Sequence, residues 1–347
     1  MMTFQVGRTR RLATGALTAT VAMAVLTGTA HAKDTHTLAY IGYSDNRGQG
    51  TILVSDADTH EEVTRIRVAG RPNGITATPD GNFIYVATES TPGVQIIDTH
   101  THEIIQEVSV GGGWANKIAF NSGGDLAYVA QGSSGAGGSR GRVYIDDVAT
   151  DQVIGSFKAG EWPTDIVITP DDTRAYVTSS ESTNVWVIDL ATHSLIATIN
   201  MGGPSSPRLA LSPDGSSLFV TSGARLSVID VATNTIGKHL ALSGRAAGVA
   251  LSPDGARAYV GEVREAGFKG VVTTVDTTDL AKIGESVEVT VGKLAVSPSG
   301  AEVYVTGDEG NTDTVVLEAE TGEIHTVLPA LENDRPSTVT LVAVPND

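Results

Sequence analysis

An all-β fold assembled from seven similar units is predicted by three features of the sequence. A Pro-Asp-Gly type of turn followed by a short β-rich segment recurs along the chain. The aromatic residue of that segment recurs at positions 40, 85, 128, 176, 219, 259 and 304, so successive units are 40 to 48 residues long. No segment shows the apolar period and the caps of a helix. Because about 45 residues form one four-stranded blade, we predict a seven-bladed β-propeller.

The second unit shows its four predicted strands most clearly. They cover Gly74 to Thr78, Phe83 to Ala87, Val94 to Ile97 and Glu103 to Val110. Pro79-Asp80-Gly81 joins the first two strands, because it supplies a fixed φ, a polar acceptor and a residue that tolerates positive φ. The inner strands are apolar at consecutive positions, which indicates that both faces of each sheet are covered by neighbours.

The two ends of the chain predict how the ring closes. Residues 335–345 repeat the pattern of residues 71–80, in which Arg-Pro precedes an apolar strand. The chain therefore ends after the first strand of a unit, and it begins with the second strand of a unit, near Leu38 to Tyr43. We predict that the C-terminal strand becomes the inner strand of a blade whose other strands are N-terminal, which leaves no open sheet edge.

Composition excludes several classes of protein. The 347 residues contain no cysteine, which excludes disulfides, a thiolate nucleophile and cysteine-ligated metal centres. Asp and Glu number 40 against 23 Lys and Arg, giving a formal net charge of −17. So acidic a chain is a poor general partner for nucleic acid. An apolar share of 40% is too high for a disordered chain.

The first 32 residues have the organisation of a signal peptide. Three arginines precede a moderately apolar stretch, and Ala30-His31-Ala32 fits an A-x-A cleavage site. The longest uninterrupted apolar run, Val21 to Leu26, is too short to span a membrane. We expect a protein that is secreted or exported to the periplasm or cell envelope after cleavage near Ala32, with residues 33–347 forming one propeller domain. Loss of the three arginines takes the formal charge from −17 to −20.

In a propeller, the segments that lead into the inner strands surround one mouth of the central channel. Aligned at the first apolar residue of each inner strand, five of seven units carry Arg or Trp four positions earlier, and four units carry a charged residue directly before it. These nine residues are Arg71, Trp114, Trp162, Arg245 and Arg335, and Lys117, Asp165, Arg208 and Lys293. Arg offers paired donors to a carboxylate or phosphate, and Trp offers a flat stacking surface. We predict non-catalytic binding of a small anion, a polymer or a protein at this mouth. The alternative is that Arg and Trp join neighbouring blades.

Two other functions stay open. Asn73, Asn116 and Asp165 lie near the starts of three consecutive inner strands and could give oxygen ligands to a divalent metal in a lactonase or lyase. The chain could instead be a structural or interaction module. No serine is placed in a G-x-S-x-G nucleophile elbow, and the motifs HExxH and Walker A are absent, so no catalytic residue is assigned. We expect no cofactor, no membrane span, no nucleic-acid partner and a monomer.

Three histidines follow the third strands of different units. They are His60, His100 and His193, with His102 two positions beyond His100. Because the outer turns of different blades lie far apart in a propeller, we expect these histidines not to share a metal ion.

The repeats resemble the YVTN family of β-propeller repeats, the YncE-like proteins. The resemblance rests on Ser-Pro-Asp-Gly at 212–215 and 252–255, on Val-Ile-Asp at 187–189 and 228–230, and on Tyr-Val pairs at 85, 128, 176, 259 and 304. It extends over essentially all of the chain after residue 32. The resemblance implies a propeller fold and an exported or surface protein, and it carries over no catalytic residue and no cofactor.

Overall fold

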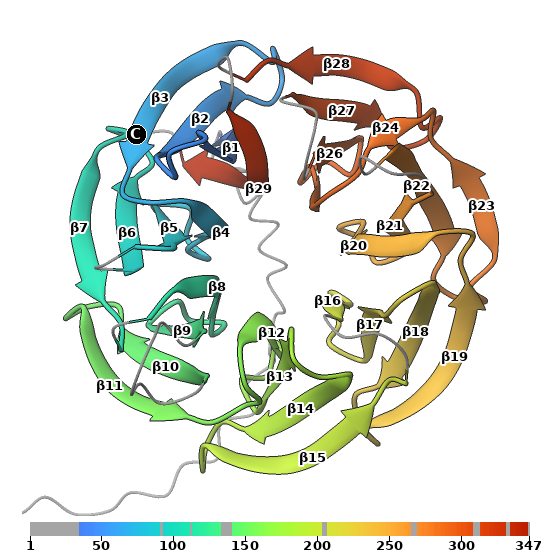
Figure 1. The fold of residues 1–347 in the computed structure, drawn as a ribbon, viewed down its shortest axis with the longest axis horizontal. Helices are drawn as coiled ribbons and strands as arrows, with labels where there is room; N and C mark the ends of the chain where they lie inside the picture. The colour runs from blue at the N-terminus through green and yellow to red at the C-terminus, as the bar shows by residue number, and fades with distance from the viewer. Residues whose placement is uncertain are drawn as a thin grey trace, which may run out of the picture. The chain divides into compact units, whose positions relative to one another are not determined.

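The computed structural model describes residues 35–90, 93–111, 113–132, 141–202, 207–264, 269–307, 313–330 and 334–345. These residues form strands and turns without a helix, and the strands make seven antiparallel sheets arranged in a ring (Figure 1). The predicted seven-bladed β-propeller is thereby confirmed. The predicted signal peptide, residues 1–32, lies outside the described residues. Among the residues described, none belongs to a helix long and apolar enough to cross a membrane.

Each blade contributes one strand to each of four layers, counted outwards from the channel (Figure 1). The innermost strands of blades 1 to 7 are β29 (Arg335–Pro345), β4 (Pro72–Ala77), β8 (Ala115–Phe120), β12 (Pro163–Ile168), β16 (Arg208–Leu211), β20 (Arg245–Leu251) and β25 (Leu294–Val296). The second strands are β1 (Thr35–Ser44), β5 (Phe83–Thr88), β9 (Leu126–Gln131), β13 (Arg174–Ser179), β17 (Ser217–Thr221), β21 (Arg257–Val263) and β26 (Glu302–Thr306).

The two outer layers follow the same blade order. The third strands are β2 (Gly50–Asp56), β6 (Gly93–Asp98), β10 (Arg142–Asp147), β14 (Asn184–Asp189), β18 (Arg225–Asp230), β22 (Lys269–Asp276) and β27 (Thr314–Glu318). The outermost strands are β3 (Glu62–Val68), β7 (Ile104–Ser109), β11 (Gln152–Phe157), β15 (Ser194–Asn200), β19 (Thr235–Ala241), β23 (Lys282–Glu285) and β28 (Ile324–Leu328). A short additional strand in blade 6, β24 (Val289–Thr290), pairs with β22.

Blade 1 closes the ring with strands from both ends of the chain. β29 pairs antiparallel with β1, from Thr35 opposite Pro345 to Ser44 opposite Arg335. The innermost strands also contact one another in a closed cycle, in which β29 meets β4 on one side and β25 on the other. The closure predicted from the two chain ends is therefore present.

The hydrophobic cores of the propeller lie between blades. One buried cluster joins Leu38, Tyr40 and Val342 of blade 1 to Ile75 and Ile84 of blade 2. Similar clusters bridge the later blades. A sheet that buries apolar side chains on both faces cannot remove them from water alone, so each blade depends on its two neighbours.

The turns between the first and second strands fit against one another around the ring. Gly215, in the turn of blade 5, has a φ of 71°, and a Cβ added there would come 2.6 Å from the ring of Pro170 in blade 4. Glycine therefore meets two needs at this position, a positive φ and a close approach to the neighbouring turn. The same contact joins Gly124 to Pro79, Gly255 to Pro213 and Gly300 to Pro253.

Blades 3 and 4 depart from this pattern together. Blade 3 has Ser122 at the proline position, and blade 4 has Asp172 at the glycine position with a φ of 56°. The Asp172 carboxylate accepts hydrogen bonds from the Ser122 backbone N–H at 2.7 Å and from the Ser122 hydroxyl at 2.5 Å. Charge-assisted hydrogen bonds thus replace the glycine–proline contact at this junction.

The turns between the third and fourth strands share one hydrogen-bond pattern. In blade 1, the Asp56 carboxylate accepts hydrogen bonds from the backbone N–H groups of Asp58 and Thr59. The residue four positions after the acidic residue is left-handed in every blade: His60, His102, Asp151, His193, Asn234, Leu280 and Gly322. His60, His100 and His193 all lie in these outer turns, and the histidine of blade 2 that takes the left-handed position of His60 and His193 is His102.

Asp146 interrupts the apolar run of a buried third strand. Ile97, Ile188 and Ile229 occupy the equivalent position in blades 2, 4 and 5. Asp146 is 1% exposed, and its Oδ1 has no hydrogen-bond partner in the described part of the chain. Burial raises the pKa of Asp146 to about 6, and the nearby charges of Asp151 and Asp147 add to the effect.

Deleting residues 338–347 removes most of β29, so blade 1 loses its inner strand. The two hydrophobic clusters that blade 1 forms with blades 2 and 7 then lose the buried side chains that β29 contributes. We expect the thermal midpoint of the whole propeller to fall by about 10 °C or more, measured by far-ultraviolet circular dichroism. Deleting residues 346 and 347 alone is the control, and it should leave the midpoint in place. Equal midpoints for the two truncations would contradict closure by β29.

The Ser122–Asp172 contact predicts a coupled pair of substitutions. Ser122→Pro removes the donors and Asp172→Gly removes the acceptor, whereas the double variant recreates the contact found at the other junctions. In urea unfolding, we expect the free energy of unfolding of the double variant to be about 1 kcal/mol higher than the two single-variant changes predict when added together. Strict additivity would show that the two positions do not interact.

Asp146→Asn predicts a pH-dependent gain in stability. The folded-state pKa lies above the unfolded value, so wild-type stability is complete below about pH 4 and falls as pH rises through 6. We expect the Asn variant to be more stable than wild type by about 2 kcal/mol at pH 7 and equal to it near pH 4, measured by urea unfolding. A gain that does not change between these pH values would show that the Asp146 charge is not its cause.

Candidate functional site

A β-bulge near the start of the inner strand shapes one end of the channel in five blades. The strand register shifts by one residue at Asn73, Asn116, Thr164, Ala247 and Ser337. A bulge sends two successive side chains in directions that a regular strand would not allow. The residue after the bulge lines one cavity in four of the five blades, as Lys117, Asp165, Gly248 and Thr338.

Three of the bulge residues hydrogen-bond to the inner strand of the next blade. The bonds run from Ser337 Oγ to the Pro72 carbonyl at 2.6 Å, from Asn73 Nδ2 to the Ala115 carbonyl at 3.2 Å, and from Asn116 Nδ2 to the Pro163 carbonyl at 2.7 Å. Thr164 makes no such bond. Its Oγ1 is buried without a hydrogen-bond partner among the described residues, and the Pro207 carbonyl of the next blade accepts from Thr178 at 3.0 Å.

The charged residues at the starts of the inner strands share one cavity. Lys117, Asp165, Arg208 and Lys293 line a space of about 160 Å³ together with Thr164. They come from blades 3, 4, 5 and 7, and they are the four charged residues that the sequence alignment placed directly before the first apolar residue. We call this space the channel cavity.

The channel cavity carries a net positive charge, since three cations face one carboxylate. Both Asp165 oxygens are engaged, accepting the backbone N–H groups of Ile166 and Leu209 at 3.1 Å each. The Lys293 ammonium donates to the carbonyl of Asn73, reaching from blade 7 to blade 2. Within the described residues, no ion pair or side-chain hydrogen bond engages the cationic groups of Lys117 and Arg208.

The three predicted arginines of the outer set lie apart from the channel cavity. Arg71 and Arg335 line a second depression of about 420 Å³ at the boundary of blades 1 and 2. Asp45 and Glu89 line the same depression, so its acidic and basic charges balance. Arg245 is exposed at the first residue of β20.

The two predicted tryptophans meet across the boundary of blades 3 and 4. The rings of Trp114 and Trp162 are 6.3 Å apart at an angle of 61°. Trp162 covers Gly132 of blade 3 so closely that a Cβ added there would come 2.6 Å from the indole. Trp114 remains 42% exposed. The pair therefore joins two blades and also presents an aromatic surface.

The three residues considered as oxygen ligands for a metal, Asn73, Asn116 and Asp165, all make hydrogen bonds between blades. Besides the bonds described above, Asn73 Nδ2 lies 3.3 Å from Asn116 Oδ1. Among the described residues, one group of three His, Asp or Glu side chains is arranged to hold an ion, and it lies elsewhere, where blade 7 meets blade 1.

Comparison with known sequences gives partial matches. No protein-family model matches the chain. It is 30% identical over 143 residues to the seven-bladed beta-propeller protein Rv1057 of Mycobacterium tuberculosis, covering 40% of this chain and 35% of the relative. It is 39% identical over 66 residues to protein NirF of Stutzerimonas stutzeri, covering 18% of this chain and 17% of NirF. The matches thus span about a third or less of the length of these curated relatives.

Solved structures share the fold over most of the chain. A functionally unknown protein from Desulfotomaculum acetoxidans superposes with a TM-score of 0.74 at 12% identity, covering 89% of this chain and 99% of that one. The chain is a seven-bladed β-propeller. Hydrazine synthase of Kuenenia stuttgartiensis gives a TM-score of 0.63 at 22% identity over 80% of this chain and 96% of its own. The dihydro-heme d1 dehydrogenase NirN, in complex with DHE, gives a TM-score of 0.64 at 16% identity, covering 87% of this chain and 74% of NirN. At such identities the likeness concerns the fold alone.

Proposed function

We propose that this propeller is a non-catalytic binding protein whose channel cavity takes a small anionic group, either a carboxylate or a phosphate. The observation that carries the proposal is the convergence of Lys117, Arg208 and Lys293 on one cavity in which Asp165 is the single acid. In a chain with a formal net charge of −17, such a local excess of cations is the feature that an anion would recognise.

The chemistry of the lining suits an oxyanion. The Arg208 guanidinium can present two parallel N–H donors to a carboxylate or phosphate, and each lysine ammonium adds a compact charge. These side chains are half-buried, so their attraction for an anion is screened less than it would be on an open surface.

The size of the cavity limits the ligand. About 160 Å³ is well below the roughly 300 to 1,000 Å³ of pockets that enclose drug-sized molecules. The cavity therefore suits a small anion or the acidic end of a larger molecule. A haem-type macrocycle, the chemistry in the name of NirN, is too large for it, and we do not extend that activity to this chain.

The outer arginines and tryptophans enter the proposal as secondary contacts. Each lies three residues before the position directly preceding the first apolar residue of its inner strand, and none of the five lines the channel cavity. Part of a polymer or protein that extends beyond the cavity would meet the Trp114–Trp162 surface or the depression of Arg71 and Arg335.

For the localisation of the protein, we propose export followed by cleavage near Ala32. This proposal rests on the sequence of residues 1–32 alone.

Isothermal titration calorimetry with inorganic phosphate and with malonate tests anion binding. We expect wild type to bind at least one of them, and Arg208→Gln and Lys117→Gln each to weaken the affinity about tenfold or more, because each variant removes a charge-assisted contact. Raising the salt concentration should weaken binding as well. Arg225→Gln is the matched control, since Arg225 is an exposed arginine on the third strand of the same blade as Arg208.

Two outcomes would contradict the channel site. Equal affinities for Arg208→Gln and Arg225→Gln, or no binding of either anion to wild type, would exclude it. Loss of binding in the triple variant of Arg71, Arg245 and Arg335 to Gln, with Arg208→Gln unaffected, would move the site to the outer arginines.

A further inference from the structure

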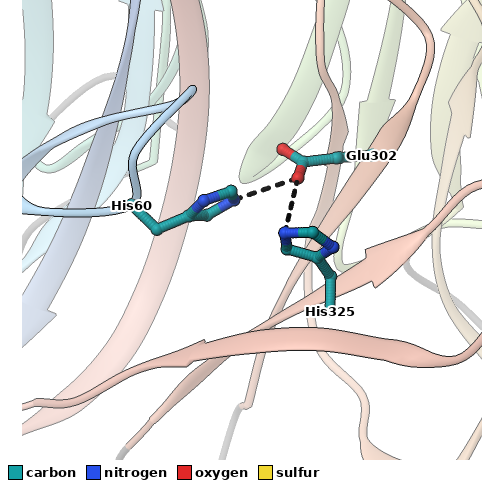
Figure 2. A group of neighbouring side chains, drawn as sticks. All are labelled: His60, Glu302 and His325. Carbon is teal, nitrogen blue, oxygen red and sulfur yellow. Dashed lines mark ion pairs between the residues drawn. The ribbon is translucent and has the colours of Figure 1, made fainter.

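Two histidines and a glutamate form a cluster where blade 7 meets blade 1 (Figure 2). His60 comes from the turn between β2 and β3, Glu302 begins β26, and His325 lies in β28. His60 Nε2 lies 3.0 Å from Glu302 Oε1, and His325 Nε2 lies 3.9 Å from the same oxygen. One ligand atom from each of the three residues lies within 4.8 Å of the other two. The cluster thus brings together residues that are up to 265 positions apart in the chain.

Residues equivalent to His60 have an ordinary role in other blades. Asn234 Oδ1 accepts a hydrogen bond from the hydroxyl of Tyr176 in the preceding blade at 2.7 Å. His102 Nδ1 lies 3.2 Å from the hydroxyl of Tyr40 in the same relationship. In blades 2 and 5 the left-handed residue at the end of the outer turn therefore ties its blade to the repeated tyrosine of the blade before it.

His60 departs from that role. Its ring stacks on Tyr304, with centroids 6.4 Å apart, while the Tyr304 hydroxyl donates to Glu302 Oε2 at 3.3 Å. His60 Nε2 is buried and has no hydrogen-bond partner among the described residues, because its approach to Glu302 Oε1 does not have hydrogen-bond geometry. A buried imidazole nitrogen beside a carboxylate oxygen, with no hydrogen bond between the two, is an arrangement that a shared cation satisfies.

We propose that His60, Glu302 and His325 bind one divalent transition-metal ion of the zinc type. Two imidazoles and a carboxylate are donors that suit Zn²⁺, Co²⁺ and Ni²⁺, whereas Ca²⁺ and Mg²⁺ take oxygen ligands. Zinc bonds of about 2.0–2.1 Å in a tetrahedron place neighbouring ligand atoms about 3.3 Å apart. The separations of 3.0 and 3.9 Å lie on either side of that value. His325 is 45% exposed, which leaves the fourth position open to water.

The surroundings of the cluster would orient its ligands. Glu318 Oε1 lies 3.7 Å from His325 Nδ1, on the side of the ring opposite the nitrogen that faces Glu302. The Tyr304 hydroxyl occupies the second oxygen of Glu302, which turns the first towards the histidines. Metal-binding histidines and carboxylates are commonly held by such outer partners.

The combination occurs at one junction of the ring. At the position of Glu302, the other six blades carry Leu38, Phe83, Leu126, Arg174, Ser217 and Arg257. The cluster lies at the junction between blade 7 and blade 1, and blade 1 also contains the closing strand β29. A metal ion here would link a segment near the N-terminus to one near the C-terminus, so binding would stabilise the closed ring.

Titration of the untagged, EDTA-treated protein with Zn²⁺ and Co²⁺ tests the site. We expect one ion per chain, the visible absorption of four-coordinate Co²⁺, and a rise of a few degrees in the thermal midpoint with Zn²⁺. His325→Gln and His60→Asn should each weaken Zn²⁺ binding at least about tenfold. Asn is chosen at position 60 because Asn234 takes the same backbone conformation in blade 5.

His193→Asn is the matched control, since His193 ends the equivalent turn of blade 4 and has the same left-handed conformation. It should leave Zn²⁺ affinity unchanged. Equal Zn²⁺ affinity in wild type and His325→Gln would overturn the proposal by showing that the ion binds elsewhere, and so would a stabilising effect of Ca²⁺ equal to that of Zn²⁺. If His60→Asn fails to fold, the exposed His325 still decides the question. Neither result bears on anion binding in the channel.

Discussion

Every blade of this protein has two apolar faces and no means of covering either alone. The buried clusters consequently span pairs of blades, and the ring is stable only when the last pair is made. The antiparallel pairing of β29 with β1 makes it, placing strands from the two chain ends in one sheet. Closure also brings the starts of all seven inner strands to one end of the channel, and the rest of the proposed function depends on that arrangement.

The contacts that hold blades together also decide which charges remain available to a ligand. Asn73, Asn116 and Ser337 use their polar atoms to tie one inner strand to the next. Asp165 does the same through the backbone of the following blade. The cationic groups of Lys117 and Arg208 have no such engagement among the described residues, and they face the channel with Lys293. A cationic cavity therefore forms inside an acidic protein, because Asp165, the one acid that lines it, is engaged in a contact between blades.

Much of this arrangement was predictable from local chemistry. The recurring Pro-Asp-Gly turns indicated the length of the repeat, and the Arg-Pro segment near residue 335 predicted the closing strand. Aligning the inner strands also identified the four charged residues of the channel cavity. The outer edge was less predictable, because all seven pairs of third and fourth strands contain a β-bulge that sequence spacing does not reveal.

Two features of the outer edge depend on the folded structure and not on sequence spacing. His102 and not His100 ends the turn of blade 2, since the left-handed position is set by the turn's hydrogen bonds. Glu302 and His325 meet His60 only through the packing of blade 7 on blade 1, and nothing in the spacing of these three residues indicates it.

The most direct test of the account is a crystal soaked in selenate and measured at the selenium edge. The account predicts an anomalous peak beside Lys117 and Arg208 in the channel, whereas peaks confined to the outer surface or to the depression of Arg71 and Arg335 would contradict it.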